Sequence, residues 1–405
     1  MSVSSNRHCP LCHSQDGYSI SNETWDVLAL GPVEIGFRIC RPCGLVLQDP
    51  VVPRERMLEH YAAFSNYTNP GRKGKSSPQK ERNVARQIAL TEDQSLKVGK
   101  AFQVGCSDGY TLSEFARRGW QVDGIDPSPS AGRIARDHYG IETRLGDFES
   151  AESLDIFDLF IATHVLEHVY EPVSFLEKIA RHLTTTGRLL LEVPCLVQPE
   201  LWPNGYFAFE HVQYFSPKTL EACLARAGFE ILESEIHTAK LPYPVICVIA
   251  KRSSSSKRDD LKLGEYDDAL RLVQQFTDRE RRTGWQRIEE EILPRLDRYR
   301  AICVWGAGIH TSQLLARTNL SNHALRFIVD SDRQKVGRRM AGLEIHDPSR
   351  IEEEEIDAVL ISTLGSESAV YESTRRLREK GIDVIRLYGN AEPDTADSST
   401  NGPQV

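Results

Sequence analysis

The sequence predicts an α/β protein with two parallel, doubly wound sheets and a small metal-binding segment in front of the first sheet. Three observations predict this fold class: two CxxC pairs near the N-terminus, a strand–glycine turn–helix–strand unit at 101–126, and a second such unit at 302–330. At 405 residues the chain is too long for one ordinary core. We expect domains over residues 1–75, 76–255 and 256–390, followed by a disordered tail at 391–405, which has no apolar pattern.

The composition narrows the class of protein. A hydrophobic fraction of 40% with 26% charged residues is typical of a globular protein. The net charge of -9 argues against nucleic acid as the main partner, because phosphate binding requires a basic face. No apolar run approaches the length of a membrane span, and we expect Met1–Asn6 not to be a signal peptide. Isolated cysteines beside two CxxC pairs predict a reducing, cytoplasmic location. The lack of a long apolar run predicts that the protein has no membrane partner.

The two CxxC pairs are separated by 27 residues. Each tight turn can direct two thiolates at one point, so two turns complete a tetrahedral zinc site. Four protein ligands leave no open position, which predicts a structural zinc that holds together a segment too small to bury its own core. The alternative is two unrelated redox pairs. The predicted ligands are Cys9, Cys12, Cys40 and Cys43.

The unit at 101–126 is predicted to bind a nucleoside-like ligand. Glycines in its turn let backbone amides approach a ligand at a helix N-terminus, and Asp126 can accept hydrogen bonds from two ribose hydroxyls. Farther on, Asp147 can bond an adenine amino group, with Phe148 near the ring. The alternatives are a βαβ unit without a ligand and, for Asp147, a helix or turn cap. The predicted turn consists of Gly105, Cys106, Ser107, Asp108 and Gly109.

The turn sequence VGCSDGYTL resembles the glycine loop of class I S-adenosylmethionine-dependent methyltransferases, with Ser107 at a frequent glycine and Gln103 at a frequent acid. DLFIATHVLEHV and GRLLLEVP resemble the fourth and fifth strands of that family. The resemblance implies that S-adenosylmethionine is held by the glycine turn, Asp126, Asp147 and Phe148. His164 is predicted to contact it as well, because it follows the fourth strand, where ligands bind in open α/β sheets.

The order of motifs resembles the sugar C-methyltransferases of deoxysugar biosynthesis, which have a zinc-binding N-terminal domain, a methyltransferase core and a Rossmann-like C-terminal domain. In that family a YHEH-type motif supplies Glu and His at the reacting carbon. Glu210 and His211 match its last two positions, whereas Ala208 and Phe209 do not match the first two. The resemblance also implies an active-site tyrosine in the N-terminal aromatic stretch, which we assign to Tyr67.

The implied reaction is methyl transfer to carbon of a nucleotide-activated keto-deoxysugar, in secondary metabolite or polysaccharide biosynthesis. We expect His211 to remove a proton beside the carbonyl, with Glu210 orienting the ring and raising its pKa. Tyr67 or Tyr214 would donate to the developing enolate oxygen, and His164 is a reserve base. The alternative for Glu210 and His211 is a surface pair that holds a loop.

The second glycine unit, WGAG with VDSDRQKVGRRMAG, resembles the C-terminal domain of the same family, which is thought to help hold the sugar nucleotide. The alternative is a Rossmann-like domain kept only for packing. Two other functions stay open: an O- or N-methyltransferase acting on another small metabolite, and a module that binds S-adenosylmethionine without turnover. In each enzymatic case the acceptor is a small molecule, and the protein is expected to be a monomer or homodimer.

Overall fold

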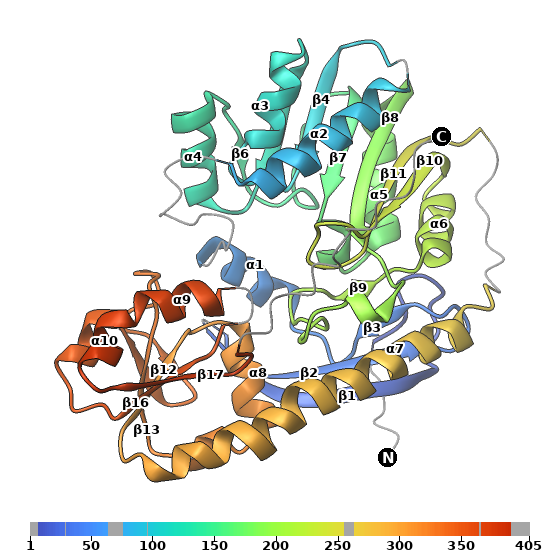
Figure 1. Cartoon of the computed structure of the whole chain (residues 1–405). Helices are drawn as coiled ribbons and strands as arrows, with labels where there is room; N and C mark the ends of the chain where they lie inside the picture. Colours follow the sequence, from blue (N-terminus) through green and yellow to red (C-terminus); the bar gives the residue numbers. More distant parts are fainter. Residues whose placement is uncertain are drawn as a thin grey trace, which may run out of the picture. The chain divides into compact units, whose positions relative to one another are not determined.

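The computed structural model describes residues 7–28, 30–63, 76–94, 96–254, 263–363 and 366–389. The described chain forms two compact units, Met1–Arg282 and Thr283–Val405 (Figure 1). The sequence-based boundaries at residues 75 and 255 stay predictions, and the predicted tail lies outside the described residues. Among the described helices, none combines the length and apolar character needed to cross a membrane.

The first unit begins with a small antiparallel sheet of order β1-β2-β3-β9. Its last strand comes from the insertion after β8, so this insertion is hydrogen-bonded to the N-terminal segment. The helix α1 (Arg54–Ala63) follows the sheet. The strands are β1 (Gly17–Val27), β2 (Gly31–Cys40), β3 (Val46–Gln48) and β9 (Gln213–Tyr214).

The central sheet has the order β10-β11-β8-β7-β4-β5-β6, with parallel pairing from β8 through β6. The chain therefore runs outward in both directions from β4, which places a crevice at the carboxyl ends of β4 and its neighbours. This arrangement confirms the predicted α/β class with a Rossmann-like parallel sheet. The strands are β4 (Lys100–Val104), β5 (Gln121–Asp126), β6 (Arg144–Leu145), β7 (Phe157–Thr163), β8 (Leu183–Pro194), β10 (Phe229–His237) and β11 (Val245–Arg252).

Three helices of this unit begin at a Ser-Pro pair. The hydroxyls of Ser77, Ser128 and Ser216 accept backbone N–H bonds from the first turn, and proline fixes the first helical φ. Ser77 therefore caps α2, which begins at Pro78, and Ser216 caps α6, which begins at Pro217. The helices are α2 (Pro78–Glu92), α3 (Tyr110–Arg117), α4 (Pro129–Tyr139), α5 (Pro172–Arg181) and α6 (Pro217–Arg226).

Successive residues of the central strands reach two different apolar cores, as expected for side chains that alternate across a sheet. Leu159 and Ile161 of β7 pack with α2 and α3, whereas Phe160 between them packs with α5 and α6. The CxxC cysteines join the second of these cores. The segment that carries the CxxC pairs is therefore packed against the central sheet rather than standing apart from it.

The second unit contains the predicted sheet, with order β14-β15-β13-β12-β16-β17; its pairs are parallel except for β14 with β15, which is antiparallel. Before this sheet in the sequence lies α7 (Tyr266–Glu280), which belongs to the first unit and is followed by π-helical turns. The strands and helices are β12 (Ile302–Trp305), α8 (Ile309–Arg317), β13 (Leu325–Val329), β14 (Arg339–Met340), β15 (Leu343–His346), β16 (Ala358–Ile361), α9 (Glu367–Ser373), α10 (Arg375–Glu379) and β17 (Asp383–Arg386).

Candidate functional site

A cavity of about 570 Å³ lies at the carboxyl ends of the central parallel strands. Its wall includes the ends of β4, β5 and β7 and residues of α1 and α2. Ligand pockets for small molecules fall in the range of about 300–1,000 Å³. The cavity therefore has the size and the place in the sheet that a nucleoside-like ligand requires.

The glycine turn and the acid after β5 form one side of the cavity. Gly105 has φ of +65°, and a Cβ added there would lie 2.8 Å from Val165 Cγ2. The backbone N–H of Ser107 donates to Asp126 Oδ2 at 2.8 Å, and that of Ser128 donates to Oδ1 at 2.9 Å. Burial raises the pKa of Asp126. The carboxylate is thus fixed at the cavity wall by two backbone amides.

Two of the five residues predicted for the turn do not line the cavity. Gly105, Cys106 and Ser107 line the cavity, but Asp108 and Gly109 are not part of its wall. Asp108 pairs with Lys80 and accepts the N–H of Tyr110 at 3.1 Å. A Cβ on Gly109 would lie 2.7 Å from the Cβ of Ala135, so this glycine allows α3 to approach α4. The Cys106 thiol is buried, which raises its pKa and keeps it protonated.

Three polar oxygens in the cavity wall have no hydrogen-bond partner within the described residues. They are Ser107 Oγ, Gln103 Oε1 and Gln87 Oε1. Buried acceptors without partners are costly, so a ligand with donor groups would bind favourably here. The sequence analysis did not select Gln87. A signal was present at Gln103, which is a polar residue inside an otherwise apolar strand.

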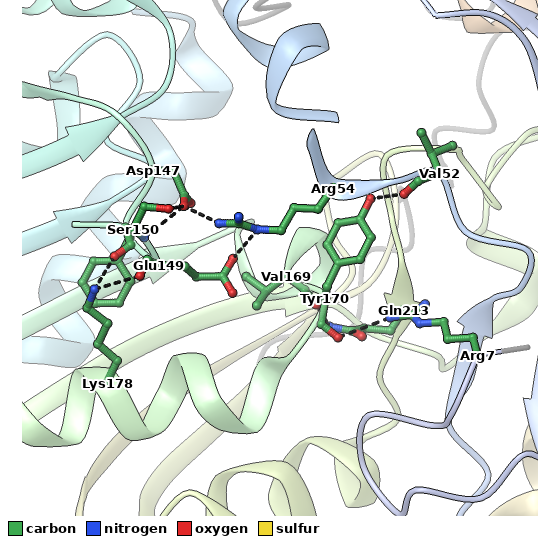
Figure 2. A network of polar contacts seen from close by, with 11 residues as sticks. Arg7, Val52, Arg54, Asp147, Glu149, Ser150, Val169, Tyr170, Lys178 and Gln213 are labelled. Carbon is green, nitrogen blue, oxygen red and sulfur yellow. Dashed lines mark hydrogen bonds and ion pairs between the residues drawn. The ribbon is translucent and has the colours of Figure 1, made fainter. Parts of the chain in front are cut away.

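Asp147 and Phe148 also line the cavity, and Figure 2 shows the contact of Asp147 with Arg54. Asp147 Oδ2 forms an ion pair with Arg54 and accepts the backbone N–H of Ser150 at 3.1 Å. Asp147 therefore caps a turn, as the alternative interpretation predicted, and also lines the cavity. Phe148 is 2% exposed, and its ring packs against Phe175 with 5.1 Å between centroids.

His164 also lines the cavity, in a left-handed backbone conformation with φ of +55°. Its Nδ1 lies 3.3 Å from Glu167 Oε1, and its Nε2 lies 3.4 Å from Glu192 Oε1. Burial opposes the charged imidazole, but Tyr243 and the two carboxylates outweigh burial and raise the pKa of His164 well above its ordinary value. Both ring nitrogens lie beside carboxylates, an arrangement that disfavours the predicted role of His164 as a reserve base.

The His164–Glu192 pair makes stability depend on pH. Burial raises the pKa of Glu192, but His164 and Arg86 outweigh it and bring the value to about 2. A lowered carboxyl pKa stabilises the fold above its unfolded value of 4.5, and this stabilisation is lost as pH falls through about 2. The raised pKa of His164 acts in the opposite sense. Its stabilisation is complete below the unfolded value of 6.5 and is lost as pH rises through the folded value.

We therefore expect His164→Gln to cost most stability at acidic to neutral pH and less at alkaline pH. Urea unfolding of the wild type and the variant between about pH 6 and about pH 9 measures the difference. His138→Gln on the exposed face of α4 is the control. A difference between wild type and His164→Gln that is constant over this range would contradict the charged pair.

The insertion after β8 places Glu210 and His211 differently from the prediction. Glu210 lines the cavity, but its Oε1 lies 3.2 Å from Nε2 of His60 rather than bonding His211. Burial and the neighbouring His168 lower the pKa of His211 to about 4, so the expectation of a raised value is wrong. His211 Nδ1 has no hydrogen-bond partner in the described part of the chain, and the ring is not part of the cavity wall.

Tyr214 is also used differently. Its side chain is buried, and its hydroxyl accepts the N–H of Ala208 at 2.7 Å and donates to the Tyr206 carbonyl at 3.2 Å. Because this hydroxyl holds the insertion together and does not line the cavity, the predicted donation to a substrate oxygen is corrected. Tyr67 lies outside the described residues.

His168 and His60, which were not predicted as site residues, both contact Glu210, and Tyr61 contacts His168. His168 Nδ1 lies 2.8 Å from the Glu210 carbonyl oxygen and 3.0 Å from the Tyr61 hydroxyl. A carbonyl can only accept, so Nδ1 carries a proton and the lone pair is on Nε2. His168 and Tyr61 both line the cavity. A signal was present in the sequence, because His168 follows the same buried strand as His164.

The four CxxC cysteines converge as predicted. Their Sγ atoms all lie within 4.8 Å of one another. Cys9 and Cys43 are 3.6 Å apart and Cys12 and Cys40 are 3.3 Å apart, measured between sulfurs. A tetrahedral zinc with bonds of about 2.3 Å separates its sulfurs by about 3.8 Å. The cluster therefore fits a zinc ion with small adjustments of the side chains.

The second unit contains a contact like the one between the Ser107 N–H and Asp126, in which a backbone amide of the glycine turn bonds the acid after the next strand. The backbone N–H of Ala307 donates to Asp330 Oδ2 at 2.8 Å, and Lys335 Nζ lies 2.9 Å from the same oxygen. Close by, His310 is buried between Ser362 Oγ at 3.0 Å and the Tyr388 hydroxyl at 2.6 Å. Burial lowers the pKa of His310 to about 4, so its ring is neutral.

Comparison with known proteins relates both units to described families. Residues 79–234 match a methyltransferase domain, and residues 298–384 match the C2185-like, N-terminal domain. A ubiquinone biosynthesis O-methyltransferase of Xylella fastidiosa is 30% identical over 200 residues, which are 44% of this chain and 79% of that protein. The C-methyltransferase NovU of Streptomyces niveus is 24% identical over 327 residues, 76% of this chain and 74% of that protein.

Other relatives align with a smaller share of their own length. Ubiquinone biosynthesis O-methyltransferases of Schizosaccharomyces pombe and Rhodopseudomonas palustris are 31% and 33% identical, but the chain spans only 36% and 38% of their lengths. A crystal structure of the magnesium protoporphyrin IX methyltransferase of Synechocystis PCC 6803 with bound S-adenosylhomocysteine has 17% identity and a TM-score of 0.40, covering 50% of this chain and all of that one. The domain match and the Xylella relative show that the chain belongs to the S-adenosylmethionine-dependent methyltransferases.

Proposed function

We propose that this methyltransferase transfers a methyl group from S-adenosylmethionine to carbon of a nucleotide-activated keto-deoxysugar. The observation that carries the proposal is an imidazole in the cavity wall, His168, whose lone pair is fixed on Nε2 by the Glu210 carbonyl. Methylation of carbon requires removal of a proton beside a carbonyl, and a positioned imidazole is the usual group for this task. The alignment with the C-methyltransferase NovU over 76% of the chain supports the acceptor class.

The cavity wall fits S-adenosylmethionine. Asp126 would hold the ribose, and Asp147 would hold the adenine end, with Phe148 beside it. The unpartnered oxygens of Gln87, Gln103 and Ser107 offer acceptors for the ammonium group of the methionine part. When bound, the cofactor supplies an electrophilic methyl group. The protein must then align the acceptor and expose its nucleophilic carbon.

In the proposed reaction His168 Nε2 accepts the proton from the acceptor carbon. The Glu167 carboxylate, with Oε1 at 3.9 Å from Nε2, stabilises the resulting imidazolium. His211 lies behind His168 with 4.9 Å between ring centroids, and its lowered pKa keeps it neutral, so it does not repel the new charge. We assign the enolate oxygen to the Tyr61 hydroxyl, whereas the roles predicted for His211 as base and for Tyr67 stay untested.

The other parts have supporting roles. We propose that the four-cysteine cluster holds a structural zinc, because all positions of a tetrahedral site are occupied by protein sulfurs. We assign the nucleotide of the acceptor to the second unit, on the contact of Asp330 with the glycine turn at Ala307. O-methylation of another small metabolite is the second candidate. The match to the ubiquinone biosynthesis O-methyltransferase of Xylella fastidiosa over 200 residues favours it.

Mass spectrometry and NMR of the products test the function directly. The protein is incubated with methyl-labelled S-adenosylmethionine and a panel of nucleotide keto-sugars, with polyhydroxylated quinone precursors as the second panel. A new carbon–methyl bond in a keto-sugar is the expected result. An O-methyl product would replace the proposal by the second candidate, and cofactor binding without any product would indicate a module without turnover.

Calorimetry tests cofactor binding separately. We expect one S-adenosylhomocysteine per chain and a loss of affinity of about tenfold or more in Asp126→Asn, since hydrogen bonds to a charged group contribute about 1.5–3 kcal/mol. Asp137→Asn on α4 is the matched control, because its side chain is largely exposed and pairs only with the neighbouring Arg136 among the described residues. A folded wild-type protein that does not bind would reject every methyltransferase proposal.

A further inference from the structure

Arg54 of α1 connects the N-terminal segment to the loop that carries Asp147 (Figure 2). Its Nη2 pairs with Asp147 Oδ2, and its Nε lies 3.3 Å from Glu149 Oε2. Arg54 and both carboxylates line the cavity. We propose that Arg54 is a positioning residue for the adenine end of the cofactor, so that the N-terminal segment completes the cofactor site. This inference rests on the proposed binding of S-adenosylmethionine.

The hydrogen bonds of Asp147 are unevenly distributed between its two oxygens. Within the described residues, Arg54, the backbone N–H of Ser150 and the Ser150 hydroxyl all bond Oδ2, the last two at 3.1 and 3.0 Å. This set of donors fixes the rotation of the carboxylate and leaves Oδ1 for a ligand. The 6-amino group of adenine is a donor that matches this acceptor.

The backbone of the same loop is fixed from the opposite side by α5. Lys178 Nζ donates to the carbonyls of Phe148, Glu149 and Ala151 at 2.8, 3.1 and 2.6 Å (Figure 2). These bonds hold the main chain but do not reach the Asp147 side chain. Of the two cationic side chains that contact this loop, only Arg54 therefore bonds the Asp147 carboxylate.

Arg54 is itself held in place at the start of α1. The Tyr170 hydroxyl donates to the carbonyl of Val52, two residues before Arg54. The Tyr170 carbonyl accepts from Arg7 Nη2 at 3.3 Å, and Arg7 Nη1 donates to Gln48 and Val212 carbonyls, both at 2.9 Å (Figure 2). These contacts join the N-terminal segment to the methyltransferase sheet, so Arg54 approaches Asp147 from a fixed position.

The pair also has an electrostatic consequence. Burial raises the pKa of Glu149, so a second carboxylate beside Asp147 is unfavourable without a cation between them. Arg54 forms a planar fork that reaches both carboxylates, which a lysine cannot reproduce. Loss of Arg54 would leave two carboxylates at the adenine end without a cation and would remove one of the three donors that hold Asp147 Oδ2.

The test compares two ligands by calorimetry: S-adenosylhomocysteine and its analogue with hydrogen in place of the 6-amino group. The variant Arg54→Met is expected to bind S-adenosylhomocysteine about tenfold more weakly than the wild type, while the two proteins bind the analogue equally. Arg54→Lys should show an intermediate loss. Arg82→Met on the exposed side of α2 is the matched control and should leave both affinities unchanged.

Each other outcome decides the question. Equal losses for both ligands would show a merely structural ion pair and overturn the inference, as would unchanged affinity in Arg54→Met. If Arg54→Met loses its zinc or its circular dichroism signal, the same comparison with Arg54→Lys decides. If the folded wild type does not bind S-adenosylhomocysteine, the proposed function itself is overturned. If the wild type and Arg54→Met bind it equally well, only the inference about Arg54 is overturned.

Discussion

His168→Gln is expected to lower turnover by about 10²–10⁴-fold, the usual contribution of a general base. The physical reason is that His168 lines the cavity and keeps a basic lone pair on Nε2 when Nδ1 donates to the Glu210 carbonyl, whereas glutamine has no basic nitrogen to replace it. Cofactor affinity should stay within about twofold, because the predicted cofactor contacts lie on other residues. Single-turnover methyl transfer and calorimetry with S-adenosylhomocysteine measure the two effects.

His211→Gln and His138→Gln complete this experiment. His211 does not line the cavity, so its replacement should reduce turnover less than that of His168. His138 is exposed on α4 and serves as the control for the substitution itself. If His211→Gln is inactive while His168→Gln retains turnover, the base is His211, as predicted from the sequence, and the assignment to His168 fails.

Removal of the proposed zinc is expected to have the second large effect. Cys43→Ser takes one ligand from the four-sulfur cluster, and the apparent binding energy of a structural zinc is about 10–16 kcal/mol in small peptides. We expect loss of bound zinc and a decrease in Tm of about 10 °C or more, since 1 kcal/mol corresponds to about 2–4 °C for domains of this size. Metal analysis and thermal unfolding measure both quantities.

The same variant should bind S-adenosylhomocysteine more weakly, because the cysteines share an apolar core with α5 and α6, and α1 with Arg54 follows in the same segment. Cys223→Ala removes a buried cysteine outside the cluster and should retain zinc despite some loss of stability. A Cys43→Ser protein with unchanged Tm, or a wild type that contains no zinc after purification in zinc-supplemented medium, would contradict the structural role.

The elements predicted best are those whose signals lie within a few residues. The glycine turn and the acid at the end of β5 were recognised because the backbone conformation of a turn depends on immediate neighbours. The CxxC pairs were recognised because each CxxC turn directs two cysteine sulfurs to one point, so that two such turns can share one metal ion.

Side-chain partnerships were predicted less well. Glu210 and His211 are adjacent in sequence, which suggested a pair, but Glu210 bonds His60, 150 residues earlier, and burial beside His168 lowers the pKa of His211. The sequence shows neither contact, because adjacent residues need not face each other and burial is set by the whole fold.

The sequence by itself determined the parallel-sheet fold, the four-cysteine cluster and the positions of Asp126 and Asp147 beside one crevice. Only the tertiary structure decided which imidazole faces the cavity and which cation reaches Asp147. The physical reason is one of range: turns and caps are fixed by bonds between near neighbours in the chain, whereas the direction of a side chain and its charge depend on what packing brings beside it from distant segments.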